Sequence, residues 1–254
     1  MRGLFYLMLI PGLSQAADPL CQVDFDQRRS SIAAKITGHR HVQLVPTGGV
    51  NGTPGIRVSY VGSTRGSERV VMQFGLAMQV KEAYLGYHVL FEQDFLFVRG
   101  GKLHGLGPAD PAVGGEKVDP DTWSARLMFG SDSALKTYNY HQRLKGVYGE
   151  GVEVRRFRFK KDRWYRINYH VRLNDPPQAN GFVRVLVDGK PLLEEEHLRF
   201  RDEDKARTLI QRFLFSTFHG GSSKRYAPKT AKGALTTVHA RFDNFAVYPG
   251  RPGP

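Results

Sequence analysis

The chain has 254 residues, and 37 lysines and arginines stand against 24 aspartates and glutamates, a formal net charge of +13. Hydrophobic residues make up 41%, which is enough for an ordinary globular core and excludes a disordered basic tail. No apolar run reaches the roughly 18–20 residues that span a bilayer, and a single cysteine excludes a disulfide framework or a cysteine-rich zinc site. The basic excess predicts an anionic partner: nucleic acid, an anionic membrane surface or an acidic polysaccharide.

The first 16 residues have the pattern of a secretory signal peptide. Arg2 precedes an apolar run from Leu4 to Ile10, and a small-residue cleavage site ends at Ala16. The alternative is an N-terminal strand or core segment. We expect cleavage after residue 16, a single mature domain over residues 17–254, and a secreted or periplasmic protein. Export disfavours a nucleic-acid partner and favours a polysaccharide.

Most of the chain consists of short runs that alternate apolar and polar residues between turns rich in glycine and proline. Strict alternation predicts strands with one buried face. The predicted strands are Gly86–Arg99, Ser124–Phe129, Val152–Phe159, Trp164–Leu173, Phe182–Val187, Leu209–Phe218 and Val238–Tyr248. Helical periodicity is weak, with one short charged candidate at Asp202–Arg207. Many strands with few helices predict an all-β fold, an antiparallel β-sandwich of the jelly-roll type.

A glycine-rich segment, Gly100–Leu106, follows the predicted strand segment Phe95–Arg99. Its glycines permit a tight turn and bring Lys102 close to a ligand. It is not a phosphate-binding P-loop, since it lacks that spacing and a following helix. The alternative interpretation is a plain turn with a solvated lysine.

Two later strands place candidate functional side chains on a shared face. In the run Ser124–Phe129, Ser124 and Arg126 alternate with apolar residues, and Tyr138 and Tyr140 share a face of their own. Tyrosine stacks on sugar rings and transfers protons, and arginine binds carboxylates through two hydrogen bonds. The pattern fits an anionic sugar, although a solvated sheet face has the same alternation.

Other patterns give no catalytic site. His39-Arg-His41 has chelating spacing but no evident third ligand, so we expect no metal, and no other cofactor is indicated. Glu92 and Asp94 share a strand face without the pairing that glycoside hydrolysis needs. The basic run Arg155–Arg158 alternates along one strand, which favours contact with a polyanion over nucleic-acid binding.

Several motifs in order resemble the alginate and glucuronan lyases of polysaccharide lyase family 14. They are Phe97-Val-Arg-Gly-Gly-Lys-Leu-His-Gly-Leu106, Trp123-Ser-Ala-Arg-Leu-Met128, Tyr138-Asn-Tyr140, Val171-Arg-Leu-Asn174, Val187-Asp-Gly-Lys190, Phe215-Ser-Thr-Phe-His-Gly-Gly221 and Phe242-Asp-Asn-Phe245. The resemblance extends from about Gly86 to Tyr248. It implies a jelly roll whose concave sheet forms a basic cleft for an acidic polysaccharide. It also implies that the functional residues are Lys102, Ser124, Arg126, Tyr138 and Tyr140.

The chain departs from the family pattern at two positions. His104 stands where the family loop usually has proline, and His219 stands where a later loop often has phenylalanine. Both changes bear on the lining of the cleft and hence on substrate preference. We expect His104, His141, Arg166 and His219 to bind the substrate.

The resemblance implies β-elimination on a uronate, in which the C5 proton is removed and the 4-linked oxygen leaves. Arg126 would neutralise the carboxylate, and Ser124 would position the substrate. Lys102 would be the base or a second cation, and Tyr138 or Tyr140 the acid; a tyrosine as base stays an alternative. We expect a monomer with no membrane span. A carbohydrate-binding module that holds the polymer without cleaving it is the competing hypothesis.

Overall fold

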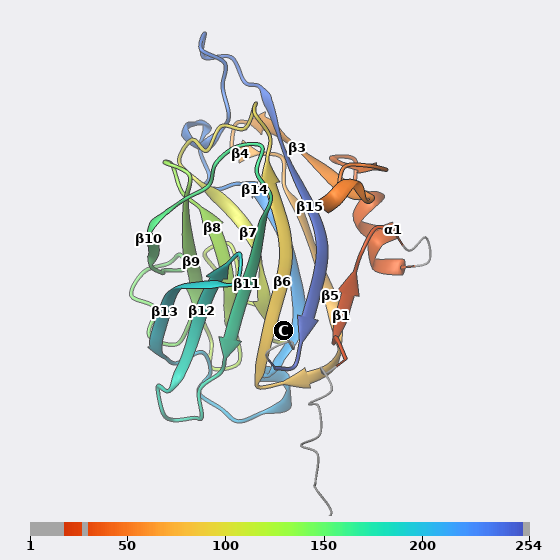
Figure 1. Ribbon diagram of the computed structural model, residues 1–254. Coiled ribbons are helices and arrows are strands. Elements are labelled where there is room, and N and C mark those ends of the chain that lie inside the picture. Colours follow the sequence, from red (N-terminus) through yellow and green to blue (C-terminus); the bar gives the residue numbers. More distant parts are fainter. Residues whose placement is uncertain (1–17, 27–29, 251–254) are drawn as a thin grey trace, which may run out of the picture.

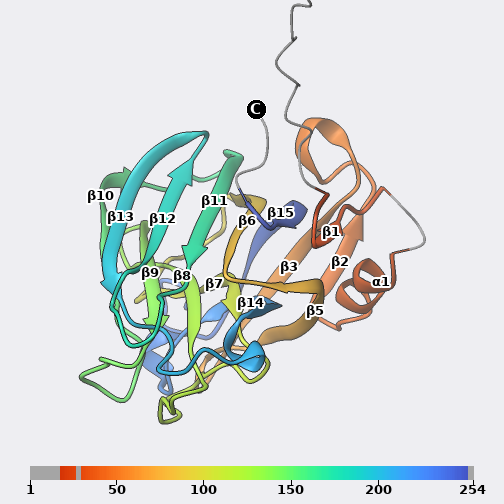
Figure 2. The same cartoon turned by 90° about the horizontal axis from the view of Figure 1, so that it is seen from below.

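A computed structural model describes residues 18–26 and 30–250, so the predicted signal peptide lies outside the described residues. Two antiparallel sheets pack face to face, and their apolar inner faces form one core (Figure 1). Figure 2 shows the two layers from below, with β11, β12 and β13 on one side and β7, β8 and β9 on the other. The predicted antiparallel β-sandwich is confirmed.

The large sheet contains nine strands. Its order is β13 (Lys190–Leu198), β12 (Gly181–Val187), β11 (Tyr165–Arg172), β6 (Glu82–Phe91), β15 (Thr237–Tyr248), β3 (Gly55–Ser63) and β2 (Val42–Val45). β1 (Cys21–Val23) pairs with β15, and β4 (Gly66–Ser67) pairs with β3.

The small sheet contains six strands. Its order is β10 (Glu153–Arg158), β9 (Ala134–Tyr140), β8 (Ser124–Phe129), β7 (Gly101–Gly107), β14 (Ile210–His219) and β5 (Val70–Val80). All the pairings within it are antiparallel.

Alternation predicts the buried face of most strands correctly. In β11, Tyr165, Ile167, Tyr169 and Val171 are buried as expected, and β8 buries Ala125, Leu127 and Phe129. The observed bounds of these strands lie within a residue or two of the predicted ones. Period 2 is a reliable signal here because each sheet has one apolar face.

The helices were not predicted well. Within residues 18–26 and 30–250 there is one α-helix, α1 (Ser31–Thr37). Its N-cap is Ser30, whose side chain accepts a hydrogen bond from the Ala33 amide. Three 3₁₀ turns complete the helical content of the described chain: η1 (Val50–Gly52), η2 (Ala206–Thr208) and η3 (Lys224–Tyr226). η2 begins at the end of the predicted charged helix. None of the described helices is long and apolar enough to cross a membrane.

The predicted strand over Gly86–Arg99 is wrong in its second half. β6 ends at Phe91, and a turn follows in which Val98 adopts a positive φ of 50°. Phe95 and Phe97 nevertheless point into the core, where their rings meet those of Phe91 and Phe129. The alternating aromatic residues therefore belong to the connection between β6 and β7, from which they pack into the core.

The Phe95 ring should therefore be a main determinant of stability. It is fully buried, with its centroid 4.5 Å from that of Phe91. We expect Phe95→Ala to lower the free energy of unfolding by about 3–5 kcal/mol, measured by urea denaturation. Leu96→Ala is the control, because Leu96 is 36% exposed, and it should cost less than about 1 kcal/mol. Equal losses in the two variants would contradict this view of the core.

Candidate active site

The outer face of the small sheet collects the candidate residues. One row crosses four strands through successive backbone pairs: Lys136 on β9, Met128 on β8, Lys102 on β7 and Phe218 on β14. A second row places Tyr138 beside Arg126 and Arg126 beside Gly105. The pairing register thus brings Lys102, Arg126 and Tyr138 together on one face.

Lys102 lies on strand β7 and not in the predicted turn, with its side chain largely covered. Its Nζ is 3.0 Å from the centroid of the Tyr138 ring and 3.2 Å from Met128 Sδ. Burial, and then the positive charges of Arg126, Lys136 and Arg69, hold the pKa of Lys102 well below the ordinary lysine value. No described carboxylate lies within 4.0 Å of this amine to oppose the shift.

Arg126 lies on β8, between β7 and β9, and its guanidinium is buried. It is 4% exposed, and its Nε and Nη2 have no hydrogen-bond partner among the described residues. Its Cζ is 5.5 Å from the Tyr138 ring centroid and 5.9 Å from that of Tyr140. Burying a charge without a counterion is costly, so unsatisfied donors of this kind mark a place prepared for an anion.

A glycine makes room for this arginine. Gly105 faces Arg126 across the β7–β8 pairing, and a Cβ at position 105 would lie 2.5 Å from Arg126 Cγ and 2.1 Å from the Ala125 carbonyl oxygen. Such distances are shorter than any real Cβ contact. The Arg126 stem therefore lies across the bare backbone of β7.

The two tyrosines differ in environment. Their hydroxyl groups are 3.4 Å apart, and the fully buried Tyr140 accepts a hydrogen bond of 3.0 Å from the Gly115 amide. Tyr138 is only half-buried, and burial followed by the Tyr140 contact raises the pKa of its phenol well above the ordinary value. Tyr138 is thus the more accessible phenol, and it carries its proton at neutral pH.

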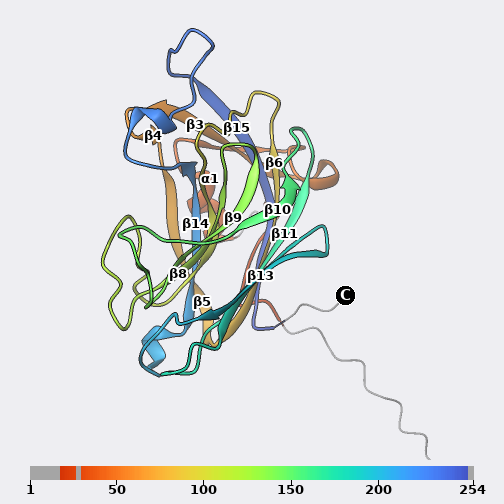
Figure 3. The same ribbon diagram turned by 90° about the vertical axis from the view of Figure 1, so that its left-hand side faces the viewer.

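Two loops lie at one end of the small sheet, residues 108–123 between β7 and β8 and residues 141–152 between β9 and β10 (Figure 3). Both contact the tyrosine pair. Gly149 lies directly against both tyrosine rings, so that a Cβ there would be 2.8 Å from Tyr140. The Tyr148 ring packs against Gly115 of the other loop. The loops therefore meet over Tyr140.

Ser124 shares the outer face with Arg126 but does not reach the open surface. It is fully buried, and its hydroxyl donates a hydrogen bond of 2.7 Å to the Ala112 carbonyl. The expectation that Ser124 contacts substrate is corrected by this burial: the side chain anchors the 108–123 loop.

His104 lies in the core and does not line a cleft. The pairing of β7 is irregular between Lys102 and Gly105. The three residue steps between them on β7 lie opposite two steps on β8 and four steps on β14, so strict alternation is broken there. The His104 ring turns inward, and its Nδ1 accepts a hydrogen bond from the Ser216 amide where the β14 register shifts. Burial lowers its pKa to about 3, so it stays neutral. The prediction that it binds substrate is wrong.

His219 is also a core residue. Along β14 it alternates inward, its ring stacks on Phe95, and its Nε2 is 2.6 Å from the Leu96 carbonyl oxygen. Burial lowers its pKa to about 4. This predicted substrate contact is corrected as well.

His141 and Arg166, which were predicted to bind the substrate, are not part of the group around Lys102 and Arg126, and this prediction is corrected. His141 is 7% exposed, follows β9 on the side opposite Tyr140, and pairs with Glu150 at 3.0 Å. Arg166 lies exposed on β11 of the large sheet, where it pairs in register with His88 of β6. Alternation assigned each side chain a face but could not tell which sheet, or which side, carries the site.

Two cations near Lys102 and a set of polar residues beneath the site were not predicted from the sequence. Lys136 alternates with Tyr138, which was an available signal, whereas Arg69 precedes β5 and joins the site only through folding, with its Cζ 5.1 Å from the Phe218 ring centroid.

The polar support lies on the inner side of β9. Asn139 accepts a hydrogen bond from the Tyr169 hydroxyl and donates one to Glu195 of β13, and Thr137 donates to the same carboxylate. Burial raises the Glu195 pKa. These bonds tie β9, and with it Tyr138, to the large sheet.

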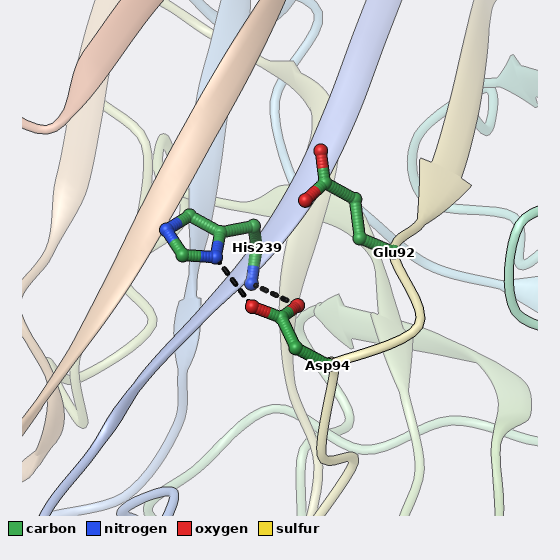
Figure 4. Close-up of side chains that lie close together, drawn as sticks. All are labelled: Glu92, Asp94 and His239. Carbon is green, nitrogen blue, oxygen red and sulfur yellow. Dashed lines mark hydrogen bonds and ion pairs between the residues drawn. The ribbon is translucent and has the colours of Figure 1, made fainter.

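A second cluster, Glu92, Asp94 and His239, has the composition of a cation site (Figure 4). Glu92 is held by Arg57 and by Arg241, each at 2.7 Å, and His239 Nδ1 is 2.6 Å from Asp94. Two guanidinium groups already supply the positive charge that a metal would bring. The arrangement is that of an ion-pair network on the large sheet.

Comparison with known proteins finds two kinds of similarity. The family model for Polysaccharide lyase 14 matches residues 56–245. Among solved structures, alginate lyase Aly36B is 20% identical with a TM-score of 0.73, over 92% of this chain and 98% of that chain. The marine PL-14 alginate lyase from Aplysia kurodai is 24% identical with a TM-score of 0.67, over 91% of this chain and 99% of that one.

A more distant match is the endo-beta-1,4-glucuronan lyase from the fungus Trichoderma reesei, 14% identical with a TM-score of 0.55, over 84% of this chain and 88% of that one. At these identities the structural likeness shows the fold. No curated protein sequence gives a significant match.

The effect of the neighbouring positive charges on the pKa of Lys102 should be detectable in a titration of its side chain. We expect an NMR titration of the lysine side chains to show Lys102 losing its proton at a lower pH than free lysine does. Lys136→Met should raise the pKa of Lys102, because it removes a like charge, and Lys190→Met, an exposed lysine on β13, should leave it unchanged. An ordinary lysine pKa at position 102 would contradict this electrostatic description.

Proposed function

Since the chain belongs to the polysaccharide lyase 14 family and is a lyase of acidic polysaccharides, we propose that it cleaves its substrate on the outer face of the small sheet. The family match over residues 56–245 includes Lys102, Arg126, Tyr138 and Tyr140. The single observation that carries the assignment is Arg126, a buried guanidinium with unsatisfied donors next to an amine of depressed pKa.

The reaction is a β-elimination on a uronate residue. The C5 proton leaves, the electron pair forms the C4–C5 double bond, and the bond from C4 to the linking oxygen breaks. The transition state carries extra charge on a carboxylate that is already negative. In this proposal Arg126 binds that carboxylate through two hydrogen bonds, which stabilises the charge as it develops.

Lys102 is the base in this proposal. A neutral amine is required, and burial together with three neighbouring cations favours the neutral form. Tyr138 has the opposite tendency, because its pKa is raised and a phenolate is disfavoured. The alternative of a tyrosine base, which the sequence leaves open, is therefore less favourable than the lysine.

Tyr138 is the acid. Its protonated, half-buried phenol lies against Lys102 and donates a proton to the departing oxygen. Tyr140 acts as a positioning residue: it contacts the Tyr138 hydroxyl and is fixed by the Gly115 amide. Ser124 contributes by holding the covering loop at Ala112.

The substrate in this proposal is a polyuronate. The related structures are named as alginate lyases and as a glucuronan lyase, so alginate, polymannuronate and glucuronan are the polymers to compare. Residues 1–16 have the signal pattern that supports export to the periplasm or the medium. The protein works as a monomer in this proposal.

Removing the base should abolish turnover. We expect Lys102→Met to lower kcat by about 10²–10⁴-fold on the preferred polyuronate, as judged by the ultraviolet absorbance of the unsaturated product. Lys190→Met removes an exposed lysine on the large sheet and should keep normal turnover. If the wild-type protein binds every polymer but releases no unsaturated product, the binding-module hypothesis replaces the lyase.

The pH profile should separate the base from the acid. Neutral Lys102 accumulates as pH rises through its lowered pKa, so kcat/KM should rise with pH well below the ordinary pKa of lysine. We expect Tyr138→Phe to lower kcat by about 10²-fold or more while keeping this acidic limb. Loss of the limb in Tyr138→Phe would instead identify the tyrosine as the base.

A further inference from the structure

A second guanidinium lies on the same sheet face and takes no part in the proposed reaction. Arg212 belongs to β14, where the inward residues are Phe213 and Phe215, so Arg212 points outward with Leu214. It is only partly exposed, and its Nε is buried without a hydrogen-bond partner in the described part of the chain. Arg126 has the same unsatisfied Nε.

Glycines flank Arg212 on both neighbouring strands. Its backbone partners are Gly107 on β7 and Gly75 on β5. Pro111 lies close to Gly107, whereas only Arg212 itself approaches the Cβ position of Gly75, with Nη1 at 3.6 Å. The guanidinium therefore lies beside exposed backbone of β5, where Gly75 contributes no side chain.

The charge at this position is not compensated. No carboxylate among the described residues lies within 4.0 Å of Arg212, in contrast to Arg57 and Arg241 of the large sheet, which share Glu92. A partly buried guanidinium with an unpaired donor costs free energy that a bound anion would recover. The fitting ligand is a planar carboxylate, which a guanidinium binds through two parallel hydrogen bonds.

The position of Arg212 suits a polymer that also occupies Arg126. Arg126 pairs with Gly105, and Gly105 pairs with Leu214, so Arg212 lies two strands across and two residues along the same face. These steps correspond to about 10 Å across the strands and about 7 Å along them. A polyuronate carries one carboxylate on every sugar, so a chain with one carboxylate at Arg126 presents others at such distances.

We propose that Arg212 is a specificity-determining residue that binds the carboxylate of a second uronate in the same chain, remote from the bond that breaks. The proposal rests on the proposed function, because it assumes a polyuronate across this sheet face. Arg212 contributes to affinity and to the length of substrate required, and leaves the chemical step to Lys102, Arg126 and Tyr138.

The test compares Arg212→Gln with the control Arg166→Gln, which removes an exposed arginine from the large sheet. We expect Arg212→Gln to raise KM for the polymer by about tenfold or more and to change kcat by less than about twofold. The effect should shrink on the shortest oligouronates that are still cleaved. Arg212→Lys should restore part of the affinity, and Arg166→Gln should match the wild type.

A second variant tests the same surface without removing the charge. Gly75→Leu places a side chain on the exposed backbone beside Arg212 and should produce the same length-dependent rise in KM. Thermal unfolding of each variant shows whether the fold is kept. An unchanged KM in folded Arg212→Gln, or an equal change at every oligomer length, would overturn the proposal.

Direct binding keeps this inference separate from the proposed function. Titration calorimetry with alginate, polymannuronate and glucuronan should show a weaker Kd for Arg212→Gln than for the wild type, whether or not cleavage occurs. Binding without product formation in the wild type would refute the lyase mechanism and keep the Arg212 subsite. Cleavage with an unaltered Kd in Arg212→Gln would refute the subsite and keep the lyase.

Discussion

The site depends on uncompensated positive charge held against a rigid sheet. Lys102 and Arg126 are largely buried, and no carboxylate in the described part of the chain forms an ion pair with either, an arrangement that costs free energy. The sandwich tolerates it because the inward side chains of β7 and β8, such as Leu103 and Leu127, are fully buried in the core. The neighbouring strand β9 is tied to the large sheet by the hydrogen bonds of Asn139. The packing of the core thus offsets the free-energy cost of the two buried charges, and a bound polyanion would lower that cost.

Sequence periodicity predicts the parts of this site that lie on regular strands. Arg126 and Tyr138 alternate with buried residues on β8 and β9, so their shared orientation follows from period 2 alone. His104 shows where that reasoning fails. The irregular pairing of β7 turns two successive residues inward. No local feature of the sequence specifies how many residues of β8 and β14 lie opposite this part of β7.

Contacts between distant segments account for the other differences. Ser124 has the alternation of an open surface residue, but the loop containing Ala112 folds over it. Arg166 lies on the polar face of its strand, but that strand, β11, belongs to the opposite sheet. Family resemblance supplied the residue types and their order along the chain. Burial and hydrogen bonding separate the residues proposed to contact the substrate from those that support them.

The irregularity in β7 also limits how this face can change in evolution. Lys102 and Gly105 are three residues apart and still both face outward, because the irregular pairing of β7 turns Leu103 and His104 inward together. Loss of one residue there would restore strict alternation and leave both residues facing outward, but only one of the two inward side chains, Leu103 and His104, would remain to fill the core. Point substitutions can change the chemistry of this surface, but the number of residues between Lys102 and Gly105 is fixed by the packing of the core beneath them.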